Sequence, residues 1–196
     1  AVSRVLKRDL RGRVLESTDP YAGAVTVHWS PFGDLRWYKA AKSELSLEHD
    51  LIGRITVRKS ATGSVDRYFW DTAAHGLGAL DYAESSDGVR KSQTYDANGR
   101  LSTTTWRFDG EDFPFSYVYD SFGRVEHLQS PNIPGFGDPV VSWTYQNGQL
   151  RSAEDLLTGV KWQAEDYDAA GRLVSESLDA ISTIRRFDNR GRIRFL

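Results

Sequence analysis

The sequence has no cysteine and no methionine, and it is poor in proline, with 6 in 196 residues. Without cysteine, the chain can form neither a disulfide framework nor a thiolate metal site. No apolar run approaches the length of a membrane-spanning helix, and a formal net charge of −2 offers no basic face for nucleic acid. Because Met is missing even at position 1 and there is no signal peptide, we expect a piece of a longer protein.

The sequence does contain a seven-residue motif, called here the seven-residue word, that recurs at regular intervals. It reads YDANGRL at 95–101, YDSFGRV at 119–125, YDAAGRL at 167–173 and FDNRGRI at 187–193. Weaker copies are WSPFGDL at 29–35, WDTAAHGLGAL at 70–80 and YQNGQL at 145–150. The pattern predicts a single array over 1–196, with about nine repeats of roughly 22 residues.

The kernel of the word, Asp-x-x-Gly-Arg, has the chemistry of a tight turn. Asp is favoured at the first position of a type I turn, because its carboxylate accepts backbone N–H groups further along. Gly99 can adopt a positive φ without the steric penalty of a β-carbon. In the resulting hairpin Tyr95 faces Leu101 on one side of the sheet, while Asp96 faces Arg100 on the other. We therefore expect an apolar face and a face of exposed ion pairs.

The motif residues are predicted to be structural, with no catalytic role. They are Asp9, Gly12, Arg13, Asp50, Gly53, Arg54, Tyr95, Asp96, Gly99, Arg100, Leu101, Tyr119, Asp120, Gly123, Arg124, Tyr167, Asp168, Gly171, Arg172, Leu173, Phe187, Asp188, Gly191 and Arg192.

Period-two alternation follows the turns, as in Leu101, Thr103 and Thr105. Residues 40–50 also alternate and favour a strand over a helix, whereas the Pro- and Gly-rich segment 130–139 predicts a wide loop. The predicted fold is all-β, an antiparallel β-hairpin array with about two strands per repeat that forms a curved strip. An open strip has unpaired strand edges, so we also expect self-association through its ends or edges.

Residues with catalytic or metal-binding chemistry are scattered. The histidines His28, His49, His75 and His127 fall in different repeats without metal-ligand spacing. Neighbouring carboxylates such as Glu111 and Asp112 point to opposite faces of a strand and make no acid/base dyad. We predict no enzymatic activity, no cofactor and no metal.

Tryptophan leaves two interpretations open. The six residues are Trp29, Trp37, Trp70, Trp106, Trp143 and Trp162. Most fall at alternating strand positions, which favours packing against the neighbouring repeat. The alternative is a surface that displays them to glycans, as in an extracellular carbohydrate-binding or adhesion module.

The words YDANGRL, YDSFGRV, YDAAGRL and FDNRGRI resemble the tyrosine-aspartate (YD) repeats of the RHS family. That resemblance implies a segment of a spiralling β-strip shell, as in bacterial RHS polymorphic toxins, the C component of insecticidal toxin complexes and teneurins. It implies a scaffold that encapsulates and delivers a C-terminal toxin or effector domain in a secreted or cell-surface system. The implied partners are the flanking repeats and the enclosed effector domain. The net charge and the short apolar runs separately predict no nucleic-acid partner and no membrane span.

Overall fold

The computed structural model describes residues 5–19, 23–132 and 134–195, and every regular element in these residues is a β-strand. Strands β1 to β17 belong to one 17-stranded sheet, and β18 and β19 form a separate two-stranded sheet. The chain divides into two units. Unit 1 comprises residues 1–99 and 106–112, and unit 2 comprises residues 100–105 and 113–196. The predicted all-β, antiparallel hairpin array is confirmed.

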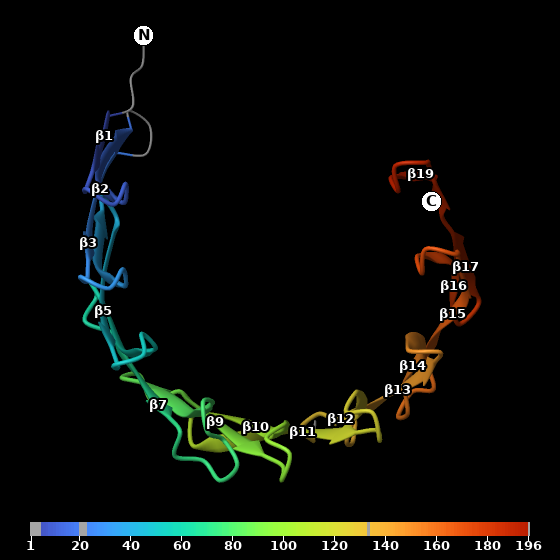
Figure 1. The fold of residues 1–196 in the computed structure, drawn as a ribbon. Helices are drawn as coiled ribbons and strands as arrows, with labels where there is room; N and C mark the ends of the chain where they lie inside the picture. The colour runs from blue at the N-terminus through green and yellow to red at the C-terminus, as the bar shows by residue number, and fades with distance from the viewer. Residues whose placement is uncertain (1–4, 20–22, 133, 196) are drawn as a thin grey trace. The chain divides into compact units, whose positions relative to one another are not determined.

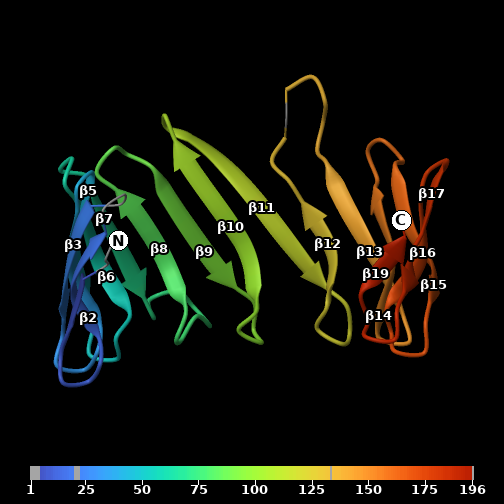
Figure 2. The ribbon, with the colours of Figure 1, turned by 90° about the horizontal axis from the view of Figure 1, so that it is seen from above.

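Unit 1 is a meander in which each strand pairs antiparallel with the next, as β8 and β9 do in Figure 2. Its first nine strands are β1 (Val5–Arg8), β2 (Val14–Asp19), β3 (Gly23–Trp29), β4 (Leu35–Ala40), β5 (Ser43–His49), β6 (Ile55–Ser60), β7 (Val65–Trp70), β8 (Leu80–Ser85) and β9 (Arg90–Tyr95).

The following two strands, β10 (Leu101–Phe108) and β11 (Glu111–Tyr119), contribute residues to both units. Unit 2 continues the same pattern of antiparallel neighbours from β11 to β17, coloured yellow to red in Figure 1. Its strands are β12 (Val125–Gln129), β13 (Val140–Gln146), β14 (Gln149–Asp155), β15 (Lys161–Tyr167), β16 (Leu173–Leu178), β17 (Ile181–Ile184), β18 (Arg186–Phe187) and β19 (Ile193–Phe195).

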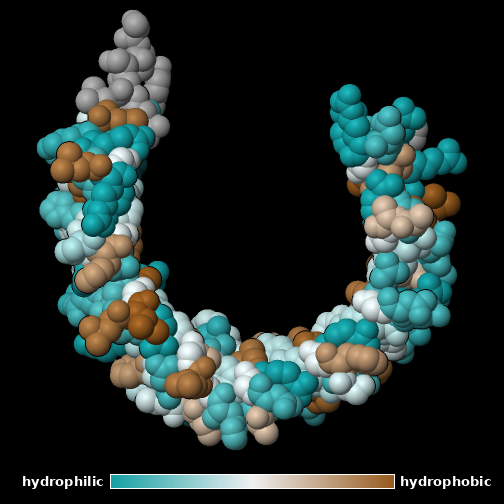
Figure 3. Space-filling view, viewed as in Figure 1, coloured by the Kyte–Doolittle hydropathy of each residue, from teal (hydrophilic) through white to brown (hydrophobic). Residues whose placement is uncertain are grey.

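The fold has very little interior. Among the described residues, the only buried hydrophobic side chains are Val27, Leu47 and Ala164. In the space-filling view of unit 1, hydrophobic surface appears as separate brown groups between teal ones (Figure 3). Because the described strands form no second layer over the sheet, cohesion must come from contacts between neighbouring strands and repeats.

Local expectations also hold. Residues 40–50 contain strand β5 and no helix, and the wide connection at 130–139 separates β12 from β13, with Ile133 outside the described residues. No helix in the described part of the chain has the length and apolar composition of a membrane span.

Candidate functional site

The repeat turn at 119–125 shows how the seven-residue word folds. The Asp120 N–H donates to the Arg124 carbonyl at 2.9 Å, and the Gly123 N–H donates back to the Asp120 carbonyl at 3.0 Å. Asp120 Oδ1 accepts the N–H groups of Phe122 and Arg124, each at 2.9 Å, while its Oδ2 accepts Arg124 Nε at 2.7 Å. One carboxylate therefore satisfies two turn N–H groups and holds the arginine.

Four other copies repeat this arrangement. Their Nε-to-Oδ2 bonds are Arg13–Asp9 at 2.6 Å, Arg54–Asp50 at 2.7 Å, Arg172–Asp168 at 2.7 Å and Arg192–Asp188 at 2.8 Å. The turn glycines Gly12, Gly53, Gly99, Gly123, Gly171 and Gly191 all have φ between 75° and 86°.

Aromatic and aliphatic residues face each other across the hairpins. Tyr119 is opposite Val125, Tyr167 opposite Leu173 and Phe187 opposite Ile193. In the copy at 145–150 the two-residue turn Asn147-Gly148 has positive φ at both residues and still places Tyr145 opposite Leu150. The fifth repeat spans the two units: Tyr95, Asp96 and Gly99 lie in unit 1, and Arg100 and Leu101 in unit 2.

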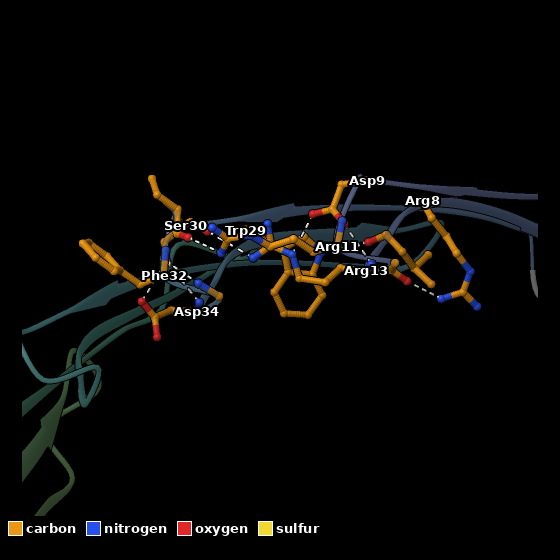
Figure 4. Close-up of polar contacts among 12 residues, drawn as sticks. Arg8, Asp9, Arg11, Arg13, Trp29, Ser30, Phe32 and Asp34 are labelled. Carbon is orange, nitrogen blue, oxygen red and sulfur yellow. Dashed lines mark hydrogen bonds and ion pairs between the residues drawn. The ribbon is translucent and has the colours of Figure 1, made fainter.

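The expected separation into an apolar face and a face of exposed ion pairs is wrong at the turns. The guanidinium of Arg13 lies 5.7 Å from the ring centroid of Trp29 in the following repeat, and the indole N–H of Trp29 donates to the Val14 carbonyl at 2.9 Å (Figure 4). Most of the ion pairs are also half-buried, with side-chain exposures of 30% for Arg124 and 16% for Asp120, whereas Arg192 in the last repeat is 71% exposed. The arginine is thus part of the apolar packing between repeats.

The contact between a repeat arginine and the next repeat's ring recurs along the array. Beyond the first step, the guanidinium-to-centroid distances are 5.1 Å for Arg54–Trp70, 4.5 Å for Arg100–Tyr119, 4.2 Å for Arg124–Tyr145 and 4.4 Å for Arg172–Phe187. We call this row of contacts, together with the hydrogen bonds described next, the repeat ladder.

The ring's polar end makes the second contact of the ladder. The indole N–H of a tryptophan or the hydroxyl of a tyrosine donates to the carbonyl of the aliphatic residue that follows the preceding repeat turn. These bonds are Trp70–Ile55 at 2.9 Å, Tyr95–Leu80 at 2.6 Å, Tyr119–Leu101 at 2.8 Å, Tyr145–Val125 at 3.0 Å and Tyr167–Leu150 at 2.6 Å. Among the described residues, both contacts with the preceding repeat are present at Trp29, Trp70, Tyr119 and Tyr145, whereas Tyr95 and Tyr167 have only the hydrogen bond and Phe187 has only the arginine contact.

Where a repeat lacks the motif arginine, other residues lie at the arginine position or against the next aromatic ring. In the long connection between β7 and β8, Gly76 lies so close to the Tyr95 ring that a β-carbon there would sit 2.8 Å from Cδ2. At the second repeat the arginine position is Asp34, and the next aromatic position is His49. His49 Nδ1 is buried without a hydrogen-bond partner in the described part of the chain.

Ion pairing within and between repeats lowers carboxyl pKa values. The Arg172 guanidinium, followed by the Arg172 backbone N–H, lowers the pKa of Asp168 below its ordinary value. Arg54 bonds to Asp50 and also, with two nitrogens, to Asp71 of the next repeat. Together with the Gly78 N–H, Arg54 lowers the pKa of Asp71 to about 2.

The remaining tryptophans differ in their contacts. The indole N–H groups of Trp37 and Trp162 donate to Glu44 and Glu176, at 3.0 and 2.8 Å. Trp106 is 38% exposed, with Lys91 Nζ 5.4 Å from its ring centroid. Among the described residues, no three His, Asp or Glu side chains gather as metal ligands.

Sequence reasoning missed the ladder and Gly76. The ladder had a signal in the sequence, because each of its arginines precedes the next repeat's aromatic residue by 15 to 21 positions. No pattern in the sequence indicates that Gly76 is constrained, since only the three-dimensional path of the loop brings it onto Tyr95. What the geometry defines is a repeat scaffold in which most hairpins are held by contacts with the hairpin before them.

Comparison with known proteins agrees with a repeat scaffold of this kind. No family model matches the chain. Two curated proteins from Dickeya dadantii (strain 3937), named probable deoxyribonuclease RhsB and probable deoxyribonuclease RhsA, are each 26% identical over 166 residues. Each match covers 77% of this chain but only 11% of the relative's length. Both relatives are Rhs proteins, which bears out the resemblance to the RHS family that the seven-residue word predicts.

Solved structures share the fold at low sequence identity. The chain is similar to a Tc holotoxin pore from Photorhabdus luminescens, with a TM-score of 0.60 and 17% identity over 98% of this chain and 12% of that one. It is likewise similar to a TcdB2–TccC3 crystal structure, with a TM-score of 0.56 and 15% identity over 97% of this chain and 13% of that one.

Proposed function

We propose that this array is part of the wall of an RHS-type shell that encloses and delivers a C-terminal toxin or effector domain of its parent protein. The observation that carries the proposal is the repeat ladder, which joins hairpin to hairpin without a second layer or a conventional core. A wall needs this property, because it must extend while remaining one sheet thick. The fold likeness to Tc toxin chains supports the same reading.

In this proposal the array of about nine repeats is one segment of a longer repeat region and carries no catalytic step itself. Its partners are the flanking repeats and the enclosed domain, and the parent acts in a secreted or cell-surface system. The deoxyribonuclease named in the two relatives belongs to proteins of which this chain matches only 11%.

Limited proteolysis of the full parent chain tests the proposal. We expect the domain that follows the repeats to resist a protease while the array is intact. It should become cleavable when the ladder is broken by the double substitution Arg124→Ala with Tyr145→Ala. Arg107→Ala serves as the control, since Arg107 pairs with Asp112 outside the ladder. Equal cleavage of the domain in all three proteins would contradict encapsulation.

A further inference from the structure

The chain contains two Asn-Gly sequences, and both lie in exposed hairpin turns. Asn98-Gly99 belongs to the fifth repeat turn, and Asn147-Gly148 is the two-residue turn between β13 and β14. An asparagine that precedes glycine can lose ammonia without an enzyme, because glycine has no β-carbon to hinder the approach of its backbone nitrogen to the asparagine side chain. The two turns differ in what this nitrogen contacts.

The reaction is intramolecular. The glycine nitrogen loses its proton to solvent and attacks Cγ of the asparagine, the bond from Cγ to the side-chain nitrogen breaks, and that nitrogen leaves as ammonia. Water then opens the cyclic imide at either of its carbonyls. One product is aspartate, and the other is isoaspartate, whose main chain runs through the side chain and gains a carbon atom. A glycine N–H that already donates a hydrogen bond must first give up that bond.

At the fifth repeat the glycine nitrogen is held in the turn. The Gly99 N–H donates to the Asp96 carbonyl at 2.9 Å, and the Asn98 N–H donates to Asp96 Oδ1 at 2.9 Å. The His75 carbonyl lies 3.4 Å from the β-carbon position of Gly99, so the neighbouring loop also covers this turn. Reaction at Asn98 therefore requires the turn to open.

At the seventh repeat the glycine nitrogen is free. Gln146 pairs with Gln149 across the two-residue turn, and the Gly148 N–H has no hydrogen-bond partner among the described residues. Apart from its chain neighbours, no heavy atom lies within 4 Å of the β-carbon position of Gly148. The attacking nitrogen next to Asn147 is thus available without any opening of the turn.

The surroundings of the seventh turn also favour the reaction. Asn147 and Gly148 line a cavity of about 320 Å³ together with Phe122, Arg124 and Tyr145. Water in such a cavity can open the imide. A guanidinium beside the turn stabilises the negative charge that develops on the asparagine oxygen as the new bond forms.

We propose that Asn147 is a site of spontaneous deamidation, and that its isoaspartate product loosens two steps of the repeat ladder. The aspartate product fits the turn, because Asp109-Gly110 has the same φ values as Asn147-Gly148, 52° and 81°. The isoaspartate product does not fit, because it adds a backbone carbon to a two-residue turn that sets the register of the hairpin.

That register positions two ladder contacts. Tyr145 lies opposite Leu150 across the turn. The Tyr145 ring is the partner of Arg124 at 4.2 Å, and the Leu150 carbonyl accepts the Tyr167 hydroxyl at 2.6 Å. A change of register moves both groups, so one modified residue weakens the contacts with the sixth repeat and with the eighth. This inference goes beyond the proposed wall function, since it holds whether or not the array encloses a payload.

Ageing of the folded chain in mildly alkaline buffer tests the site. Peptide mapping by mass spectrometry measures how much of each asparagine has become a carboxylate, and an isoaspartate-specific methyltransferase distinguishes the two products. In the folded chain Asn147 should convert about tenfold faster than Asn98, a factor that one hydrogen bond can supply. In urea, where the Gly99 N–H is released, the two rates should converge.

Urea unfolding of the aged samples tests the effect on the ladder, with each protein compared with its own fresh sample. The aged parent should unfold at a lower midpoint. Asn147→Gln should keep its midpoint, because the longer side chain forms an imide far more slowly, whereas the matched control Asn98→Gln should lose as much as the parent. Fresh Asn147→Asp should unfold like the fresh parent, since it adds the charge without the extra carbon atom.

Three results would overturn the proposal. Equal conversion of Asn98 and Asn147 in the folded chain would remove the assignment of the site. A rate difference that persists unchanged in urea would refute the free Gly148 N–H as its cause. An aged parent that contains isoaspartate at position 147 and keeps its midpoint would refute the loosening of the ladder.

Discussion

Arg124 and Tyr145 belong to successive repeats, yet the guanidinium of the first lies 4.2 Å from the ring centroid of the second, and the Tyr145 hydroxyl donates to the Val125 carbonyl at 3.0 Å. One residue thus fixes its own turn through Asp120 and the following hairpin through Tyr145. Stability in this array should follow contacts between repeats more closely than contacts within them.

Arg124→Ala tests that expectation. The ring contact alone should contribute about 0.5–2 kcal/mol, and the substitution also removes the bond to Asp120. Arg107→Ala is the matched control, because Arg107 bonds to Asp112 twice at 2.6 Å but lies over no ring in the described residues. In urea unfolding, Arg124→Ala should lower the midpoint more than Arg107→Ala does. Equal losses would show that the ring contact contributes nothing.

Tyr167→Phe removes one hydroxyl of the ladder and leaves its ring. The Tyr167 hydroxyl donates to the Leu150 carbonyl at 2.6 Å, so its loss should cost about 1 kcal/mol in the free energy of unfolding. Tyr117→Phe is the control, since the Tyr117 hydroxyl bonds to no described residue. Denaturant titration of both variants checks the difference, and a larger loss for Tyr117→Phe would refute the role of the hydroxyl.

Gly76→Ala should destabilise unit 1 by about 1–3 kcal/mol, because the new methyl would lie 2.8 Å from the Tyr95 ring. A double-mutant cycle isolates the cause. If the ring is responsible, the same substitution made in a Tyr95→Ala background should cost much less. An unchanged penalty in that background would place the strain elsewhere.

Gly171→Val should destabilise the eighth repeat by about 1–3 kcal/mol, because its φ of 76° disfavours a β-branched residue. Ala170→Val changes the adjacent, exposed turn position and should have little effect. Thermal melts compare the two. A Gly171→Val melt that matches the parent would contradict the turn geometry.

Acid should weaken the contact between the third and fourth repeats. Asp71 has an ordinary carboxyl pKa of 3.8 and a folded pKa of about 2, so its bond to Arg54 stabilises the fold above pH 3.8. That stabilisation is lost as the pH falls from about 4 towards 2, since the unfolded chain then binds the proton first. Asp71→Asn should flatten the pH dependence in this window. An equally steep loss of stability in Asp71→Asn would exclude this carboxylate.

The sequence allowed the hairpins to be predicted but not the way they are joined. Asp120, Gly123 and Tyr119 have local chemistry that specifies a turn and its cross-strand pair. The seven-residue word was therefore sufficient to predict the all-β array. The stacking of Arg124 on Tyr145 depends on the approach of separate hairpins, and a side chain as long as arginine can reach either face. For the same reason the exposure of the Asp–Arg pairs was misjudged, and the loop that carries Gly76 onto Tyr95 could not be foreseen.

The ladder has a direction. At every step described above, the guanidinium and the accepting carbonyl belong to the earlier repeat, and the aromatic ring belongs to the later one. During synthesis the earlier repeat leaves the ribosome first, so each new hairpin meets a neighbour whose docking groups are already in place. Assembly can then proceed in the order of translation, one hairpin at a time, with no need to wait for distant residues.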